Sequence, residues 1–222
     1  MLPDSSFLFV AVPIAFVVII WFAMRQSSDK PQCIFVIGPP GAGKGTQSAL
    51  IVANHSNVKH YSVGDLLRHA RDTNHPHATL IATAIAKDDV VPVHITLAIM
   101  KEAMDRDVKH NKIKGFLIDG YPRNMDNLNG WNEHMSRHVD LRGVILLTID
   151  DDVAIQRAGG RMRDHNDIKE AALKRLATRK QRSLPVIEYY QKRNLLRIVD
   201  ANEDKETVYN KVNKIVTDLF QL

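Results

Sequence analysis

The segment Ile37–Gln47 reads IGPPGAGKGTQ and follows the apolar run CIFVIG at residues 33–38. A turn of the form Gly-x4-Gly-Lys that leaves a strand and opens a helix directs backbone N–H groups and the helix N-terminus toward one point. Such a loop is suited to hold a polyphosphate, and its lysine, Lys44, reaches the terminal phosphates. A strand, loop and helix in this order also favour a parallel sheet covered by helices.

The rest of the chain continues this alternation of apolar, β-rich runs with helical patterns. The expected strands lie at residues 33–38, 58–63, 115–119, 143–149 and 195–199. The expected helices lie at residues 44–55, 64–73, 77–87, 93–107, 125–136, 151–158, 167–194 and 203–220. Several strands are continuously apolar, as is typical of strands covered on both faces. We therefore expect an α/β fold with a five-stranded parallel sheet that binds ligands at the carboxyl ends of its strands.

Composition adds weaker constraints. The 222 residues are enough for one well-filled core and do not require two domains. The formal charge of +5 is compatible with anionic partners, but no dense Lys/Arg run with interleaved aromatic residues is present, so we expect no nucleic-acid partner. The single cysteine, Cys33, cannot form an internal disulfide and favours a reducing compartment.

The N-terminal region is different in character. Residues 7–24, FLFVAVPIAFVVIIWFAM, form an uncharged run of 18 residues, and a helix of that length spans about 27 Å, enough for a thin bilayer. Arg25 and Lys30 follow the run, so the positive-inside rule places the remainder in the cytoplasm. We expect residues 1–30 to form a single-pass membrane anchor and linker, with residues 31–222 as one domain facing the cytoplasm; a signal peptide or a buried helix is the alternative.

Two further segments combine with the phosphate loop. YSVGDLLR at residues 61–68 ends a strand and starts a helix, which places Arg68 one turn into that helix. FLIDGYPRNMDN at residues 116–127 is an apolar strand followed by a Gly-Tyr-Pro turn. Each has an ordinary explanation when taken alone, as a helix cap, a surface charge or a turn. Their occurrence together in one chain with the phosphate loop requires a common cause.

On these segments the chain resembles the adenylate kinase family, and within it most closely the UMP/CMP kinases. Lys44 is followed by Gly45 and Thr46 instead of directly by Ser or Thr, which departs from switch GTPases and motor ATPases and is similar to the GKGTQ ending of nucleoside monophosphate kinases. The resemblance covers residues 31–220 and implies transfer of the γ-phosphoryl group of ATP, with Mg²⁺, to a nucleoside monophosphate (NMP).

The resemblance also implies an organisation and a set of site residues. A P-loop kinase domain at residues 31–222 has a small helical NMP-binding insert at about 62–92 and a very short lid at about 157–167, and it is a monomer. The residues expected to bind ATP are Gly41, Ala42, Gly43, Lys44, Gly45, Thr46, Arg157 and Arg161. Those expected to bind the NMP are Ser62, Val63, Gly64, Arg68, Val91, Gly120, Arg123, Asn127, Arg163 and Arg175. The expected catalytic residues are Lys44, Arg123, Arg157, Arg163 and Arg175, and Asp119 is expected to hold Mg²⁺ through water.

The lid departs from the family pattern. Only Met162 separates Arg161 from Arg163, and Asn166 and Asp167 stand in place of the usual pair of acidic residues. So short a lid is expected to shield the reacting phosphates from water less well, with a risk of ATP hydrolysis.

The acceptor base is read from Asn127, because adenylate kinases usually have Gln at this position and UMP/CMP kinases have Asn. Val63 fits neither the Thr of the former nor the Ala of the latter, although it is nonpolar. The resemblance thus favours UMP or CMP as the acceptor. AMP is the alternative, and a non-catalytic, membrane-tethered ATP-binding protein is a third hypothesis from a different class.

Overall fold

The computed structural model describes residues 30–222 except 74, 88, 112, 114 and 160–166, and it leaves out the side chains of residues 111, 158, 159, 167–172 and 175. Its centre is one five-stranded sheet in which all neighbouring strands are parallel and the order is β2-β3-β1-β4-β5. The strands are β1 (Gln32–Ile37), β2 (Val58–Ser62), β3 (Gly115–Asp119), β4 (Asp140–Thr148) and β5 (Leu196–Asp200). The predicted fold class and all five predicted strands are confirmed.

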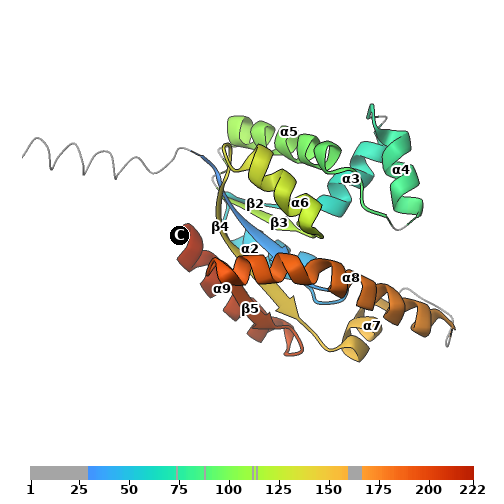
Figure 1. Cartoon of the computed structure of the whole chain (residues 1–222). Coiled ribbons are helices and arrows are strands. Elements are labelled where there is room, and N and C mark those ends of the chain that lie inside the picture. The colour runs from blue at the N-terminus through green and yellow to red at the C-terminus, as the bar shows by residue number, and fades with distance from the viewer. Residues whose placement is uncertain (1–29, 74, 88, 112, 114, 160–166) are drawn as a thin grey trace, which may run out of the picture.

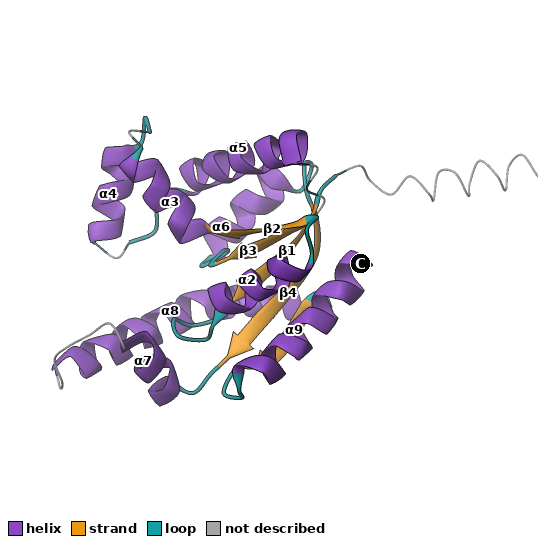
Figure 2. Ribbon diagram, turned by 180° about the vertical axis from the view of Figure 1, so that it is seen from behind, coloured by secondary structure: helices purple, strands orange, loops and turns teal. Residues whose placement is uncertain are grey.

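Helices cover both faces of this sheet. The helices of the described residues are α2 (Lys44–Asn54), α3 (Val63–Asp72), α4 (Ala78–Ala86), α5 (Val93–Asn111), α6 (Met125–Gly130), α7 (Asp151–Gly159), α8 (Asp167–Lys192) and α9 (Lys205–Phe220). The π-helical turn η1 (Trp131–Met135) continues α6. Figure 2 shows α2 and α9 over the sheet, while α6 and α8 lie over the sheet in the opposite view of Figure 1.

The residues of β1 explain why two cores form. Phe35 belongs to one core, which α5, α6 and the carboxyl-terminal half of α8 complete, whereas Ile34 and Val36 belong to the other, which α2 and α9 complete. Successive side chains of a strand point to opposite faces, so an unbroken apolar run supplies both cores at once. β1 and β3 are therefore almost fully buried along their length.

An aromatic cluster anchors the first of these cores beneath the sheet's carboxyl edge. The ring of Phe35 packs edge-on against Trp131 at 4.7 Å between ring centroids and against Tyr121 at 5.8 Å. Tyr190 of α8 approaches Phe35 at 6.1 Å. Edge-to-face geometry at these separations is favourable for aromatic pairs. The cluster fixes the turn after β3, helix α6 and helix α8 to the central strand.

Strand β4 begins earlier than the sequence predicted. The apolar pattern starts at Gly143, but pairing starts at Asp140, opposite Gln32, with a register shift between Cys33 and Ile34 of β1. The polar start is compatible with a strand because Arg142 Nη1 lies 3.3 Å from Asp140 Oδ2. The apolar pattern did not include Asp140 and Arg142, because their charged side chains pair with each other and do not enter the core.

The region between β2 and α5 is a pair of short helices, α3 and α4, that pack on each other. They stand on one side of the sheet's carboxyl edge, while α7 and the first half of α8 stand on the other (Figure 1). The apolar side chains of Leu67, Ala70 and Ile81 are buried and join the first core. The predicted helical insert at about 62–92 corresponds to this pair of helices.

The predicted localisation needs correction. The uncharged run at residues 7–24 lies outside the described residues, and in the part of the chain that the structure describes no helix is long and apolar enough to cross a membrane. Eighteen residues are at the lower limit for a bilayer-spanning helix, so the length of the run was a weak basis for the prediction. A single-pass anchor with a domain facing the cytoplasm is not supported.

Two glycines of the loop after β1 provide a matched test of how this loop packs against α7. Gly41 and Gly43 share a backbone φ of 83°, but a Cβ atom on Gly41 would lie 2.4 Å from the carbonyl oxygen of Ala154, and one on Gly43 meets nothing within 4 Å. We expect Gly43→Ala to lose about 1–2 kcal/mol of unfolding free energy for left-handed backbone strain. Gly41→Ala should lose roughly 1–3 kcal/mol more, because the loop must move away from α7. Urea unfolding of the two variants measures both losses, and equal losses would contradict the assigned contact.

Candidate active site

The carboxyl ends of β1 and β3 lie side by side at the centre of the sheet, and both lead directly into polar segments. Gly38 to Gly43 follow β1, and Asp119 is the last residue of β3. Parallel sheets bind ligands at this edge because the crossover connections bring the ends of neighbouring strands together there. The phosphate loop and the segment after β3, which are 75 or more residues apart in the chain, thus become neighbours.

The loop before α2 forms a cradle of backbone groups. Gly38, Gly41 and Gly43 all have positive φ, and Gly43 precedes α2 without a side-chain cap for the first N–H groups of that helix. These N–H groups and the helix dipole favour an anion at this point. The residues predicted to bind ATP here, Gly41, Ala42, Gly43, Lys44, Gly45 and Thr46, are brought together by this turn.

Lys44 is the charged residue of the cradle. Its Nζ donates a hydrogen bond to the carbonyl oxygen of Pro39 at 3.0 Å, which folds the side chain back over the loop. Burial lowers the pKa of the ammonium group below its usual value, the negative charge of Asp119 acts in the opposite direction, and the positive charges of Arg123 and Arg179 lower it further. The site therefore gathers positive charge around Lys44.

Asp119 faces the start of α2. Its side chain is nearly buried, and a Cβ atom placed on Gly45 would lie 3.7 Å from Oδ2. On the other side, Nε2 of His60 lies 3.8 Å from the same oxygen. Nε2 of His60 is buried and has no hydrogen-bond partner in the described part of the chain. Sequence analysis missed His60; its position two residues before Ser62 on β2, which pairs with β3, is the signal that places it next to Asp119.

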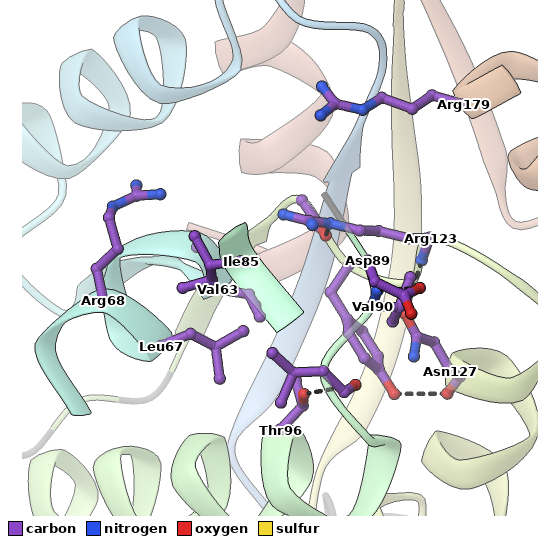
Figure 3. Close-up of a pocket in the computed structure, with 14 residues that line it drawn as sticks. Val63, Leu67, Arg68, Ile85, Asp89, Val90, Thr96, Arg123, Asn127 and Arg179 are labelled. Carbon is purple, nitrogen blue, oxygen red and sulfur yellow. Dashed lines mark hydrogen bonds between the residues drawn. The ribbon is translucent and has the colours of Figure 1, made fainter. Parts of the chain in front are cut away.

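A cavity of about 270 Å³ opens beside this cradle (Figure 3). Of the residues predicted to bind the NMP, the cavity is lined by Val63, Gly64, Arg68, Val91, Gly120, Arg123 and Asn127. Ser62 does not line the cavity; its Oγ accepts a hydrogen bond at 3.3 Å from the backbone N–H of Asp65 and caps α3. The helices α3 and α4 form one wall, and the segment after β3 with α6 forms the other.

Arg68 lies on α3 and pairs with Asp65 across one helical turn. This contact lowers the pKa of the Asp65 carboxyl, with the hydrogen bond from Arg68 as the main cause and the Ser62 contact as the next. Both side chains are about half exposed or more, at 51% and 70%. An exposed ion pair of this kind contributes little stability, so an anionic ligand in the cavity can compete for the guanidinium group.

Arg123 comes from the turn after β3. Its Nε donates to the carbonyl oxygen of Gly120 at 3.0 Å, and its backbone N–H donates to Oδ1 of Asn127 at 3.1 Å. The first bond directs the guanidinium group over the turn and toward the cavity, where Figure 3 shows it extending. The side chain is exposed, so it remains accessible to a ligand.

Asn127 is held from three directions. The backbone N–H of Asn127 donates to Oδ1 of Asn124 at 2.9 Å, its carbonyl oxygen accepts from the hydroxyl group of Tyr121, and its own Oδ1 accepts from Arg123. The residue is 3% exposed. Of the two polar atoms of a side-chain amide only the oxygen accepts, so the bond from the N–H of Arg123 fixes this amide and assigns the Nδ2 donor to the opposite side.

The four arginines predicted in the lid region and at the start of α8 are placed only in part. Arg157 of α7 donates from Nη1 to the carbonyl oxygen of Ala201 at 2.7 Å and from Nη2 to that of Asn202 at 3.4 Å, which ties α7 to the loop after β5. Arg161 and Arg163 lie outside the described residues, as does most of the predicted lid at 157–167. Arg175 lies on α8, and its side chain is not described.

Two charged residues that sequence analysis did not select also line the cavity. Asp89 precedes Val90 and Val91 in the connection between α4 and α5, and Arg179 lies on α8. Arg179 follows Arg175 by four residues, which places it on the same side of the helix one turn later. That spacing was the available signal, but Arg175 was the last residue that the resemblance selected on this helix.

The position of Lys44 leads to a test of stability. Because its pKa is lower in the folded protein than the ordinary 10.5, the charged side chain opposes folding at pH values below the folded pKa, and this effect disappears as pH rises to the unfolded value. We expect Lys44→Met to raise the unfolding midpoint of the nucleotide-free protein by about 2 °C near neutral pH, with a smaller gain at pH 10. Exposed Lys59→Met is the control and should show no such gain. A lowered midpoint would contradict the electrostatic assignment.

Comparison with known proteins is consistent with this geometry. A family model described as "Adenylate kinase" matches residues 36–195. The UMP-CMP kinase of Danio rerio is 40% identical over 192 residues, which cover 84% of this chain and 97% of that protein, and the UMP-CMP kinase of Homo sapiens is 37% identical over 191 residues with the same coverage. These relatives are thus matched over almost their whole length. The chain belongs to the adenylate kinase family.

Proposed function

We propose that the protein is an ATP-dependent nucleoside monophosphate kinase that transfers the γ-phosphoryl group of ATP to UMP or CMP. The observation that carries the proposal is the junction of two sites, a phosphate cradle with Lys44 and a cavity lined by Arg68, Arg123 and Asn127 that opens beside it. A protein that only binds ATP has no use for the second site. The substrates of the UMP-CMP kinases among its relatives indicate the acceptor.

On the donor side we assign Lys44 and the N–H groups of residues 41–46 to the phosphates of ATP. The loop contributes the backbone groups of Gly41, Ala42, Gly43, Gly45 and Thr46. Lys44 contributes an ammonium group that follows the phosphoryl group during its transfer. Arg157 and Arg161 are assigned to the donor as well. Lys44 leaves its hydrogen bond to Pro39 when phosphate oxygens replace the carbonyl acceptor.

Asp119 is the group we assign to Mg²⁺, held through water. A single nearly buried carboxylate beside the phosphate cradle fits this ion, since Mg²⁺ keeps several waters and is bound by one or two carboxylates together with substrate phosphates. When bound with ATP, Mg²⁺ neutralises charge on the phosphate oxygens. The protein's own contribution is the fixed position of Asp119 at the end of β3.

On the acceptor side we assign Arg68 and Arg123 to the phosphate of the monophosphate. A guanidinium group presents parallel N–H donors that match two phosphate oxygens, which fixes the direction from which the acceptor oxygen attacks. Val63, Gly64, Val91 and Gly120 complete this proposed subsite, and Ser62 supports it by capping α3. Arg163 and Arg175 are assigned to both the acceptor and the reaction, as the resemblance to the family implies.

The transfer itself requires positioning more than covalent chemistry. An oxygen of the acceptor phosphate forms a bond to the γ-phosphorus, and the bond from that phosphorus to the bridging oxygen of ADP breaks with its electron pair. Holding both phosphates in line converts a bimolecular reaction into one within a single complex, and positive charge stabilises the transition state. We propose residues 31–222 as the catalytic domain, with an NMP-binding insert at about 62–92 and a very short lid at about 157–167.

The pyrimidine preference is assigned to Asn127. Its Oδ1 already accepts from the backbone of Arg123, so its Nδ2 donor is the group available to a base, directly or through a water molecule. A buried amide whose oxygen and nitrogen positions are both fixed discriminates strongly between bases, because a base that does not match leaves a buried polar group without a hydrogen bond.

The proposal is tested with the full-length chain, ATP-Mg and either CMP, UMP or AMP, by measuring ADP release against a blank without an acceptor. We expect turnover with CMP and UMP well above turnover with AMP and above the blank. Preference for AMP would assign the protein to the adenylate kinases proper. Binding of ATP without acceptor-dependent turnover would contradict the kinase assignment.

Asn127→Gln tests the assigned specificity. We expect the ratio of kcat/KM for CMP over AMP to fall by at least about tenfold, since one displaced hydrogen bond in a buried site changes discrimination by about 1.4 kcal/mol or more. Asn129→Gln, an exposed change on the same helix, is the matched control and should leave the ratio unchanged. An unchanged ratio in Asn127→Gln would mean that base choice lies elsewhere.

A further inference from the structure

Arg179 stands where the two proposed subsites meet. It lies on α8 and lines the acceptor cavity together with Arg68 of α3 and Arg123 of the turn after β3. Figure 3 shows the guanidinium groups of Arg179 and Arg123 extending in the same direction from one side, with Arg68 across the cavity from them. Three guanidinium groups from three separate elements therefore surround one space.

Arg179 also acts on the donor side of the site. The positive charge of Arg179 acts on the ammonium group of Lys44, in the same sense as that of Arg123. Such an effect requires proximity, since charges separated by more than about 10 Å are largely screened. Arg179 is thus close enough to influence the lysine of the phosphate cradle while it lines the acceptor cavity.

Arg182, the next arginine of α8 after Arg179, does not share this position. Arg182 lines an adjoining cavity of about 470 Å³ with Asn124 and Asp126 and is absent from the lining of the acceptor cavity. Arg175, one turn before Arg179, is the residue that the family resemblance selected. Arg179 is therefore a distinct residue, and its placement comes from the structure.

We propose that Arg179 is a further catalytic residue, which contacts the phosphoryl group as it passes from ATP to the acceptor phosphate. The assignment rests on the proposed kinase function. In the transfer, the P–O bond to the acceptor forms while the bond to the bridging oxygen of ADP breaks, and negative charge accumulates on the oxygens between the two subsites. Arg179 supplies N–H donors and positive charge to these oxygens.

An arginine with this role contributes to kcat more than to substrate binding, because the charge that it meets is largest in the transition state. The exposed position of Arg179 at the cavity wall also means that its truncation removes no core packing. Arg179→Ala is therefore expected to fold, and an unchanged unfolding midpoint verifies this.

The experiment compares Arg179→Ala, Arg179→Lys and Arg182→Ala in the full-length chain, with ATP-Mg and with CMP or UMP as the acceptor. We expect kcat of Arg179→Ala to fall by about 100-fold or more, with KM for both substrates within about threefold of the wild type. Arg179→Lys should recover part of the loss. Guanidinium ion added at millimolar concentration should raise kcat of Arg179→Ala and leave Arg182→Ala unaffected.

Arg182→Ala removes the same charge from the next turn of the helix, so equal losses in Arg179→Ala and Arg182→Ala would indicate a general field and overturn the assignment. A change in KM for CMP with normal kcat would make Arg179 a binding residue and would overturn it as well. A kcat in Arg179→Ala close to that of an active wild type rejects this inference alone. A wild type without turnover on any monophosphate rejects the proposed function together with it.

Discussion

The site depends on one electrostatic constraint, the placement of the Lys44 ammonium group where the buried strand β1 ends. Burial and two neighbouring guanidinium groups oppose this charge, and Asp119 at the end of β3 supports it. The loop that carries Lys44 reaches this position because Gly41 approaches the backbone of Ala154 more closely than a residue with a side chain could. The positive charge around Lys44 destabilises the protein without a ligand and at the same time attracts a polyphosphate. Binding strength is therefore obtained at the expense of the stability of the empty protein.

The two walls of the acceptor cavity differ in how firmly they are held. Asn127 is fixed by local hydrogen bonds, and Tyr121, which bonds its carbonyl group, belongs to the aromatic cluster around Phe35. Arg68, on the opposite wall, has an exposed ion pair with Asp65 as its contact. This difference fits the proposed roles of the two residues. Asn127, which contacts the base, is fixed before the ligand binds, and Arg68, which binds the phosphate, can exchange one anionic partner for another.

Most of the fold could be predicted from the sequence because strands buried on both faces are continuous apolar runs, and the phosphate loop fixes where the first strand ends. The prediction was less complete where charge or tertiary contact decides the outcome. Strand β4 starts at the charged residue Asp140, which pairs with Gln32 of β1, and His60 is found beside Asp119 only through the pairing of β2 with β3. The uncharged run at residues 7–24 was a weak basis for predicting a membrane anchor, because an apolar run of minimum length is compatible with more than one structure.

Motif spacing also explains why Asp89 and Arg179 were missed. A sequence motif describes residues that are close together in the chain. The cavity, in contrast, is lined by residues from α3, from the connection between α4 and α5, from the turn after β3 and from α8. A residue such as Arg179 enters the site only when α8 packs on the sheet through Tyr190 and the aromatic cluster. The positive charge of the site is therefore assembled by folding, and a phosphate ligand that neutralises it stabilises the docking of all these elements at once. A ligand present at about 100 times its Kd adds roughly 2.7 kcal/mol to the folded state, which couples occupancy of the cavity to the integrity of the whole sheet edge.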